Sequence, residues 1–233
     1  MLIESIVDNI EDCTVLQSNT DGITIKIKKT DKDLLFSLCE RWEELTKLKL
    51  EYQSYKTFIL RDVNNYLAID INNKIKPKGC FEIIPMQNGA IAYNKNWSMR
   101  VVPKALHAYY LEGIPIDEFI RNHTDIFDFC LSFRARAGWE ILKVTINEEN
   151  EKEIIKQQRT VRYYISTTRD SLIKRNEEDK RIVQLNAGFS SVLFNKYIKK
   201  EMKDYNINYA FYISEANKIK SAVYTGQLKL FES

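Results

Sequence analysis

The chain has 233 residues, 44% of them hydrophobic, and a formal net charge of +3, so it can bury one or two cores. Its four cysteines are widely spaced and it has only two histidines, which argues against a disulfide framework and a structural zinc site. No apolar run approaches the ~18–20 residues of a membrane span, and the first residues do not resemble a signal peptide. We therefore expect a cytoplasmic protein without a membrane partner.

The charge is unevenly distributed along the chain. Residues 1–50 contain seven Lys/Arg and ten Asp/Glu, whereas residues 151–200 contain twelve and six. This asymmetry suits a protein that holds a metal near one end and phosphate groups near the other. It also arises by chance in many soluble proteins.

The first 84 residues predict a mainly antiparallel part. Apolar residues at helical spacing predict a short helix over 2–11, and two strands around the polar turn 18–22 predict a β-hairpin. Thr30 and Asp31 can cap a following helix. The expected elements are a helix over 2–11, strands over 13–17 and 23–28, a helix over 32–47, and strands over 56–60, 66–71 and 74–84.

The pattern of expected elements changes after Pro85, where a loop over 86–100 leads into short helical stretches and further strands. The expected helices are 103–112, 115–122, 126–132 and 214–223; the expected strands are 140–146 and 160–166, followed by a charged hairpin of 172–175 with 181–185. The fold class is therefore predicted as α+β. It would consist of an antiparallel part over 1–84, a mixed helical and β domain over 85–225, and a tail over 226–233.

The turn Asn-Thr-Asp-Gly at 19–22 is the first candidate site. A carboxylate at the tip of a rigid hairpin, here Asp21, can bind a divalent cation for nucleotidyl transfer. Magnesium is satisfied by one or two carboxylates together with waters and substrate phosphates. The alternative is an ordinary polar turn, where Asn, Asp and Gly are the commonest residues.

The second candidate site lies about forty residues further on, where cationic, aromatic and amide side chains gather. Lysine, arginine and tyrosine can bind phosphates, and asparagine donors can test the shape of a duplex in its minor groove. Its candidate DNA-binding residues are Lys56, Arg61, Asn64, Asn65, Tyr66, Lys76 and Lys78. The alternative is a solvated amphipathic strand pair.

Several motifs in series resemble B-family DNA polymerases of the viral kind. They are Asn-Thr-Asp-Gly at 19–22, Trp-Glu at 42–43, Tyr-Lys at 55–56, Arg-Asp-Val-Asn-Asn-Tyr at 61–66 and Lys-Pro-Lys-Gly at 76–79. They are similar to the third catalytic motif and the palm–thumb junction, and segments near 95–116 and 194–209 look like parts of the thumb. The resemblance covers nearly the whole chain. It implies that residues 1–84 are the end of a polymerase palm and residues 85–225 a thumb.

The resemblance implies that Asp21 is the catalytic aspartate that binds Mg²⁺ or Mn²⁺, with Asn19 where many members have another aspartate. No segment resembles the first catalytic motif, the nucleotide-binding fingers helix or a proofreading exonuclease. The resemblance therefore implies a split polymerase of a bacteriophage, whose larger partner subunit carries those parts. Primer–template DNA would be the shared substrate, and the isolated chain would be inactive.

The tail Gln-Leu-Lys-Leu-Phe at 227–231 resembles the short motif with which bacterial replication proteins bind the sliding clamp. Leu230 and Phe231 would fill an apolar pocket, and Gln227 would form a hydrogen bond at its rim. Leu228 is the fourth predicted clamp-binding residue. The alternative is a chain end that packs on its own protein. The alternative for the whole chain is a non-catalytic module, derived from a polymerase, that binds duplex DNA or a clamp.

Overall fold

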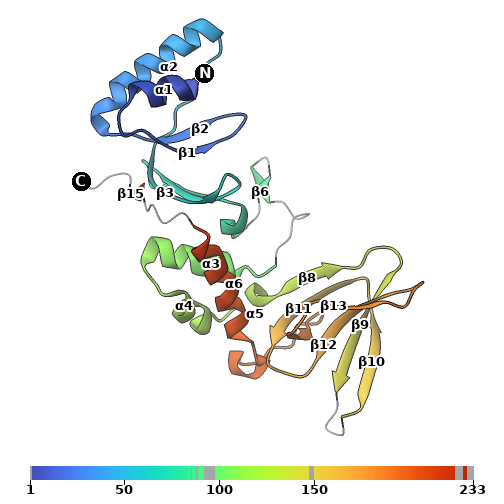
Figure 1. Ribbon diagram of the computed structural model, residues 1–233. Helices are drawn as coiled ribbons and strands as arrows, with labels where there is room; N and C mark the ends of the chain where they lie inside the picture. Colours follow the sequence, from blue (N-terminus) through green and yellow to red (C-terminus); the bar gives the residue numbers. More distant parts are fainter. Residues whose placement is uncertain are drawn as a thin grey trace. The chain divides into compact units, whose positions relative to one another are not determined.

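The structure is a computed structural model that describes residues 2–84, 86–87, 89–91, 98–146, 150–223 and 228–229. Helices and antiparallel sheets share the chain, which confirms the α+β class (Figure 1). The chain divides into two compact units. Unit 1 is Met1–Phe81 with Ala222–Ser233, and unit 2 is Glu82–Ser221. The helices that the structure describes are all too short or too polar to span a bilayer.

Unit 1 begins with two helices packed beside a β-hairpin (Figure 1). The elements are α1 (Leu2–Asn9), β1 (Thr14–Ser18), β2 (Ile23–Lys26) and α2 (Lys32–Thr46). Ile6, Ile10 and Cys39 form the buried centre, against which apolar residues of the hairpin and of α2 pack. Because every second residue of β2 is apolar, one face of the hairpin meets the helices, and its turn is left at the surface.

The second sheet of unit 1 has the strand order β15-β3-β4-β5. The strands are β3 (Tyr55–Asp62), β4 (Asn65–Asp70), β5 (Ile75–Lys78) and β15 (Leu228–Lys229). All neighbours are antiparallel, and β15 pairs Leu228 with Phe58 and Lys229 with Thr57. A 3₁₀ turn over Gly79–Phe81 ends β5 and buries Phe81 completely.

Unit 2 joins a group of helices to two sheets. The helices are α3 (Val101–His107), which continues as a π-helical turn over Ala108–Glu112, α4 (Ile116–Asn122), α5 (Ile126–Phe129) and α6 (Tyr209–Ser221). The sheets have the orders β14-β11-β8 and β10-β9-β12-β13, and a separate two-stranded pair joins β6 (Met86–Gln87) to β7 (Ala90–Ile91). The strands are β8 (Leu131–Arg134), β9 (Trp139–Ile146), β10 (Lys152–Gln157), β11 (Thr160–Ser166), β12 (Ser171–Asn176), β13 (Ile182–Gln184) and β14 (Ser190–Leu193).

Tyr212 of α6 links the helices to the sheet in unit 2. Its side chain is completely buried, and its hydroxyl donates to the Phe129 carbonyl and accepts from the Ile165 N–H, both at 2.8 Å. Burial raises the pKa of Tyr212, so the hydroxyl stays neutral. One satisfied polar group therefore fixes α6, α5 and β11 together.

A buried carboxylate also holds the helices of unit 2. Asp128 is completely buried in α5, and its Oδ2 lies 2.5 Å from Lys104 Nζ and 2.6 Å from His123 Nε2, while Arg100 Nε lies 3.3 Å from Oδ1. Burial opposes ionisation, but hydrogen bonds with His123 and Lys104 outweigh it, and the pKa of Asp128 lies below its ordinary value. The carboxylate thereby joins α3, the end of α4 and α5.

Several sequence-based expectations need correction. The helix expected over 126–132 ends at Phe129, and Leu131 begins β8; the last helix begins at Tyr209, five residues earlier than expected. Strands β10 and β14 were not predicted, and β5 ends at Lys78 rather than near 84.

The expected cap of α2 is also wrong. A 3₁₀ turn over Lys29–Asp31 precedes the helix, and Asp31 at the N-cap makes no side-chain capping hydrogen bond. The Thr30 hydroxyl instead donates to the Asp31 carboxylate at 3.1 Å.

Candidate nucleic-acid interface

Asp21 lies exposed at the tip of the β1–β2 hairpin. The turn is closed by a hydrogen bond from the Asn19 N–H to the Gly22 carbonyl and by one from the Asp21 N–H to Asn19 Oδ1, both 3.0 Å long. Asn19 therefore acts through its side-chain oxygen, which an aspartate at this position would also provide. Compared with the aspartate of the polymerase motif that this turn resembles, Asn19 keeps the acceptor and lacks one negative charge.

An exposed aspartate can supply one hard oxygen ligand to Mg²⁺, which needs several more. Among the described residues no group of three or more His, Cys, Asp or Glu side chains could hold a metal ion. Within the described part of the chain, Asp21 is therefore at most one member of a ligand set, and its role in metal binding stays a prediction.

The tight turn between β3 and β4 is held by Asn65. Its amide nitrogen donates to both carboxylate oxygens of Asp62, at 2.8 and 3.0 Å, and its Oδ1 accepts from the Cys80 N–H at 2.8 Å. The hydrogen bond from Asn65 lowers the pKa of Asp62. Gly79 has a φ of +63°, and a Cβ there would collide with the Asn64 carbonyl and the Asn65 side chain. Asn65 thus has a structural role beside its predicted contact with DNA.

Aromatic and cationic side chains share one face of the β3–β4–β5 sheet. The pairings Phe58↔Ala68, Tyr66↔Lys78 and Ala68↔Lys76 put Phe58, Tyr66, Lys76 and Lys78 on this face. A bulge near residue 56 adds Tyr55, which pairs with Asp70. We call these five residues, Tyr55, Phe58, Tyr66, Lys76 and Lys78, the Tyr–Lys face.

The rings of the Tyr–Lys face support its lysines. Phe58 stacks on Tyr66 with ring centroids 5.1 Å apart, and Tyr55 meets Phe58 edge-on at 5.3 Å. The Nζ atoms of Lys76 and Lys78 lie 5.7 and 5.6 Å from the centroids of Tyr55 and Tyr66. Cation–π attraction therefore holds two positive charges in place over a rigid sheet.

Asp70 fixes the loop beside this face. Its Oδ1 accepts the N–H groups of Asn72 and Lys74, both at 2.9 Å, and its Oδ2 lies 3.9 Å from Lys76 Nζ. In the same loop Asn73 Oδ1 accepts from Lys56 Nζ at 2.8 Å. The loop between β4 and β5 is thus connected to β3 through Lys56 and to β5 through Lys76.

The structure brings only some of the predicted DNA-binding residues together. Tyr66, Lys76 and Lys78 belong to the Tyr–Lys face, whereas Arg61, Asn64 and Asn65 lie at the β3–β4 turn and Lys56 lies near Asn73. Arg61 Nε is 3.8 Å from Asp62 Oδ2. The sequence analysis missed Tyr55 and Phe58, which alternation along β3 could have indicated only with the position of the bulge known.

Of the predicted clamp-binding residues, only Leu228 falls in a described segment, as part of β15. Gln227, Leu230 and Phe231 lie outside the described residues. The predicted docking of this tail is therefore untested.

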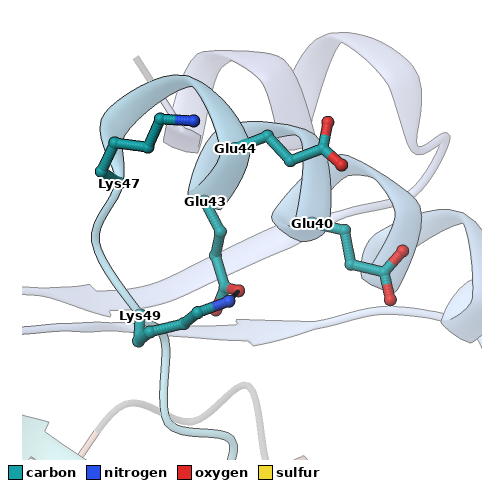
Figure 2. A pocket seen from close by; sticks show the side chains of 5 residues that line it. All are labelled: Glu40, Glu43, Glu44, Lys47 and Lys49. Carbon is teal, nitrogen blue, oxygen red and sulfur yellow. Dashed lines mark hydrogen bonds and ion pairs between the residues drawn. The ribbon is translucent and has the colours of Figure 1, made fainter.

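A shallow hollow of about 380 Å³ lies at the end of α2 and is lined by charged residues (Figure 2). Glu43 meets Lys49 there, with Oε2 2.8 Å from Nζ, while the carboxylates of Glu40 and Glu44 point away from this pair. Glu43 Oε1 also accepts the Leu50 N–H at 2.6 Å, and the hydrogen bond from Lys49 is the main cause of its lowered pKa. These contacts hold the segment after α2 against the helix, so the charged residues around the hollow have a structural role.

No family model, no curated protein and no solved structure matches the chain.

Proposed function

We propose that this chain is the palm–thumb subunit or fragment of a template-directed B-family DNA polymerase, and that it grips the primer–template duplex. The observation that carries the proposal is the Tyr–Lys face. It combines two fixed lysines with three aromatic rings on the strands that carry the junction-like motifs. The series of motifs quoted above supports the same family. As a replication protein of a bacteriophage, the chain would act in the cytoplasm of its host.

The geometry of the Tyr–Lys face suits a duplex backbone. Lysines held over rings present charge at fixed positions, and a stiff sheet cannot follow a flexible strand. Phosphate contacts of this kind position a protein on DNA without reading the sequence. We therefore expect binding that is insensitive to sequence and strongly dependent on salt.

In this proposal Asp21 contributes one oxygen ligand to the catalytic Mg²⁺ or Mn²⁺. The metal stabilises the charge that develops on the attacking and leaving oxygens. The exposed hairpin tip supports this role, because a carboxylate there is free to enter a shared site. A larger partner would supply the first palm aspartate, the fingers and the exonuclease, so the isolated chain would be inactive.

Duplex binding tests the grip. Lys76→Gln with Lys78→Gln should weaken duplex binding and reduce the log–log salt slope by about 1.8, because each phosphate contact on duplex DNA contributes about 0.9. Lys32→Gln with Lys47→Gln removes the same charge from the ends of α2 and serves as the matched control. Equal losses in both double variants would show that only net charge matters and would contradict the proposal.

Primer extension by the reconstituted complex tests the catalytic half. The partner to try first is the product of a neighbouring reading frame that carries the missing motifs. Asp21→Ala should abolish extension and leave duplex binding largely unchanged. Asp8→Ala, which removes an exposed carboxylate of α1, should change neither extension nor duplex binding. Full extension by the Asp21→Ala complex would remove Asp21 from the mechanism.

A second candidate function is a non-catalytic module that binds duplex DNA or a sliding clamp, and Asn19 in place of a family aspartate favours it. In that case no partner would restore extension, although duplex binding would persist. Clamp docking through residues 227–231 would have to displace the backbone pairing of β15 with β3. If the chain is instead the polymerase subunit and its tail docks on a clamp, deleting residues 226–233 should remove the gain in processivity from added clamp and leave distributive synthesis intact.

A further inference from the structure

Unit 2 carries a pair of stacked aromatic rings at its surface. Phe127 of α5 and Tyr197, four residues after β14, have ring centroids 5.4 Å apart and an interplanar angle of 26°. Phe127 is 40% exposed and Tyr197 is 57% exposed, and the neighbouring Ile198 is 60% exposed. We call Phe127 and Tyr197 the aromatic platform. Since one face of Tyr197 lies against Phe127, its other face is available to a ligand.

The platform is rigidly supported from below. Phe194 is buried and meets Phe127 and Tyr197 edge-on, at 5.6 and 6.3 Å. The hydroxyl of the buried Tyr205 donates to the Ile198 carbonyl at 2.7 Å and accepts from the Lys200 N–H at 3.2 Å. The segment that carries Tyr197 is thus anchored on both sides of the ring, so a ligand would meet a preorganised surface.

Cations surround the aromatic platform. The guanidinium carbon of Arg162 lies 5.5 Å from the Phe127 centroid. The backbone N–H of Arg162 donates to Asn195 Oδ1, which connects β11 to the segment that carries Tyr197. Lys196, Lys199 and Lys200 are all exposed and form no ion pair with another described residue. Their charge is complementary to a polyanion, and no carboxylate of the described residues neutralises it.

Another aromatic side chain of unit 2, Trp139, shows the contrasting case of a ring that is already in contact with cations. The ring of Trp139 has Lys174 Nζ at 5.0 Å and Arg181 Cζ at 5.3 Å from its centroid, and the side chain is only partly exposed. Its cations are already placed on the ring. At the aromatic platform the ring of Tyr197 is open instead, and its lysines are free for an external partner.

We propose that the aromatic platform is a binding site for single-stranded nucleic acid. An unpaired base would stack on the open face of Tyr197, and Lys196, Lys199 and Lys200 would hold the flanking phosphates. Sequence-independent single-strand sites combine these two features, a basic groove and aromatic stacking surfaces. A duplex cannot use the open ring, because the faces of its bases are covered by their neighbours. The site is therefore distinct from the Tyr–Lys face, and it does not depend on the proposed polymerase function.

Fluorescence anisotropy with labelled single strands tests the site on the full chain. The probes are oligothymidylate and oligouridylate of about 12 nucleotides, within the usual length of a single-strand site, and an abasic oligonucleotide of the same length. Tyr197→Ala should weaken binding of the base-containing strands about tenfold, because base stacking is worth that much per base. The abasic strand should bind the wild type as weakly as the normal strands bind Tyr197→Ala. Tighter binding of one sugar type identifies DNA or RNA as the ligand.

Two control variants and one charge variant complete the test. Tyr197→Phe keeps the ring and should bind within about twofold of the wild type, since stacking needs the ring and not the hydroxyl. Tyr52→Ala removes an exposed tyrosine of unit 1 and should bind as the wild type does. Lys196→Gln with Lys199→Gln should lower the salt slope by about 1.4, from about 0.7 per single-strand contact.

Thermal melting of each variant confirms that unit 2 is folded, and the comparison of abasic and normal strands on the wild type tests stacking if the alanine variant fails to fold. Three results would overturn the proposal: no measurable binding of either single strand at low salt, wild-type binding by folded Tyr197→Ala, or equal binding of abasic and normal strands.

Discussion

The two units each carry an aromatic and cationic surface, but the two surfaces are built differently. On the Tyr–Lys face of unit 1, Lys76 and Lys78 already lie over their rings, and the rings belong to neighbouring strands of one sheet. On the aromatic platform of unit 2, Tyr197 is more than half exposed, and the nearby lysines extend from an irregular segment.

This difference predicts a difference in ligand. Where the cations occupy the ring faces, the surface offers fixed charge and little room for a base, which favours a regular phosphate backbone. Where the ring is open and the nearby lysines are exposed and do not lie on a ring, the surface favours a base that has left its partner. Similar residue types can therefore serve two strand forms, depending on whether their rings are already covered.

The largest expected effect is a loss of stability confined to unit 2. Asp128→Ala leaves Lys104 and Arg100 without their buried counter-charge and should lower the free energy of unfolding of unit 2 by about 3–5 kcal/mol. Asp117→Ala, at an exposed position of α4, should cost far less. Urea unfolding followed by circular dichroism measures both. Single-strand binding should fall with the unfolding of unit 2, while duplex binding by the Tyr–Lys face should persist. A wild-type unfolding curve for Asp128→Ala would contradict the assigned role.

The ionisation of Asp128 also makes the stability of unit 2 depend on pH. Because the folded pKa of Asp128 lies below the ordinary 3.8, its ionised form stabilises the fold above that pH. This contribution is lost as the pH falls from about 3.8 through the folded pKa. Thermal melting between neutral and acidic pH should show this loss in the wild type. The loss should be smaller in Asp128→Asn, which cannot titrate.

Unit 1 should be destabilised by a substitution at Gly79. Alanine there combines a positive φ with a collision against the Asn64–Asn65 turn, and should destabilise unit 1 by roughly 2–4 kcal/mol. Gly113→Ala in unit 2 also has a positive φ, but its Cβ would meet no atom within 4 Å, so it should cost less. Duplex binding should suffer in Gly79→Ala and survive in Gly113→Ala. Equal stability of the two variants would show that the close packing around Gly79 contributes nothing.

The smallest effect is chemical and reports on the two units separately. Burial raises the pKa of the Cys130 thiol in unit 2 to about 12, so its reactive thiolate is scarce in the folded protein. Cys13 in unit 1 is only half-buried, whereas Cys130 is buried, although burial raises the pKa of the Cys13 thiol as well. Mass spectrometry after brief iodoacetamide treatment should find Cys13 modified before Cys130, and Asp128→Ala should expose Cys130. Early modification of Cys130 in the wild type would contradict its burial.

The strongly patterned elements could be predicted from the sequence. The alternation of residues 23–28 and the helical spacing of residues 32–47 gave β2 and α2 closely, and β11 was predicted with its observed bounds. The compact units divide between residues 81 and 82, and unit 1 also includes Ala222–Ser233. The assignment of residues 1–84 to a palm, 85–225 to a thumb and 226–233 to a tail stays a prediction.

The errors have physical causes. The short run Ile126–Ser132 is rich in apolar residues, which suits a buried helix as well as a strand, but Cys130 has extended backbone angles, and the chain enters β8. Tertiary pairing overrides local preference there. Strand β10 has an apolar pair, Ile154–Ile155, between charged residues rather than a strict alternation, so its pairing with β9 was not visible locally.

The site followed the same pattern. Lys76, Lys78 and Tyr66, three of the predicted DNA-binding residues, share one face of the sheet, and their contact with DNA stays a prediction. The ring of Tyr55 reaches this face through a bulge that sequence alone does not locate. The aromatic platform joins residues 127, 162 and 197, and only tertiary structure brings them together.

The most direct test of the account is a crossed binding measurement on the full chain. Labelled duplex and labelled single strand of matched length are titrated with wild type, with Lys76→Gln/Lys78→Gln, with Tyr197→Ala and with the combined variant. We predict that the lysine variant loses duplex affinity, that Tyr197→Ala loses single-strand affinity, and that the combined losses are additive because the sites are independent. If both variants weaken both ligands to the same extent, the two surfaces are not separate sites and the account is wrong.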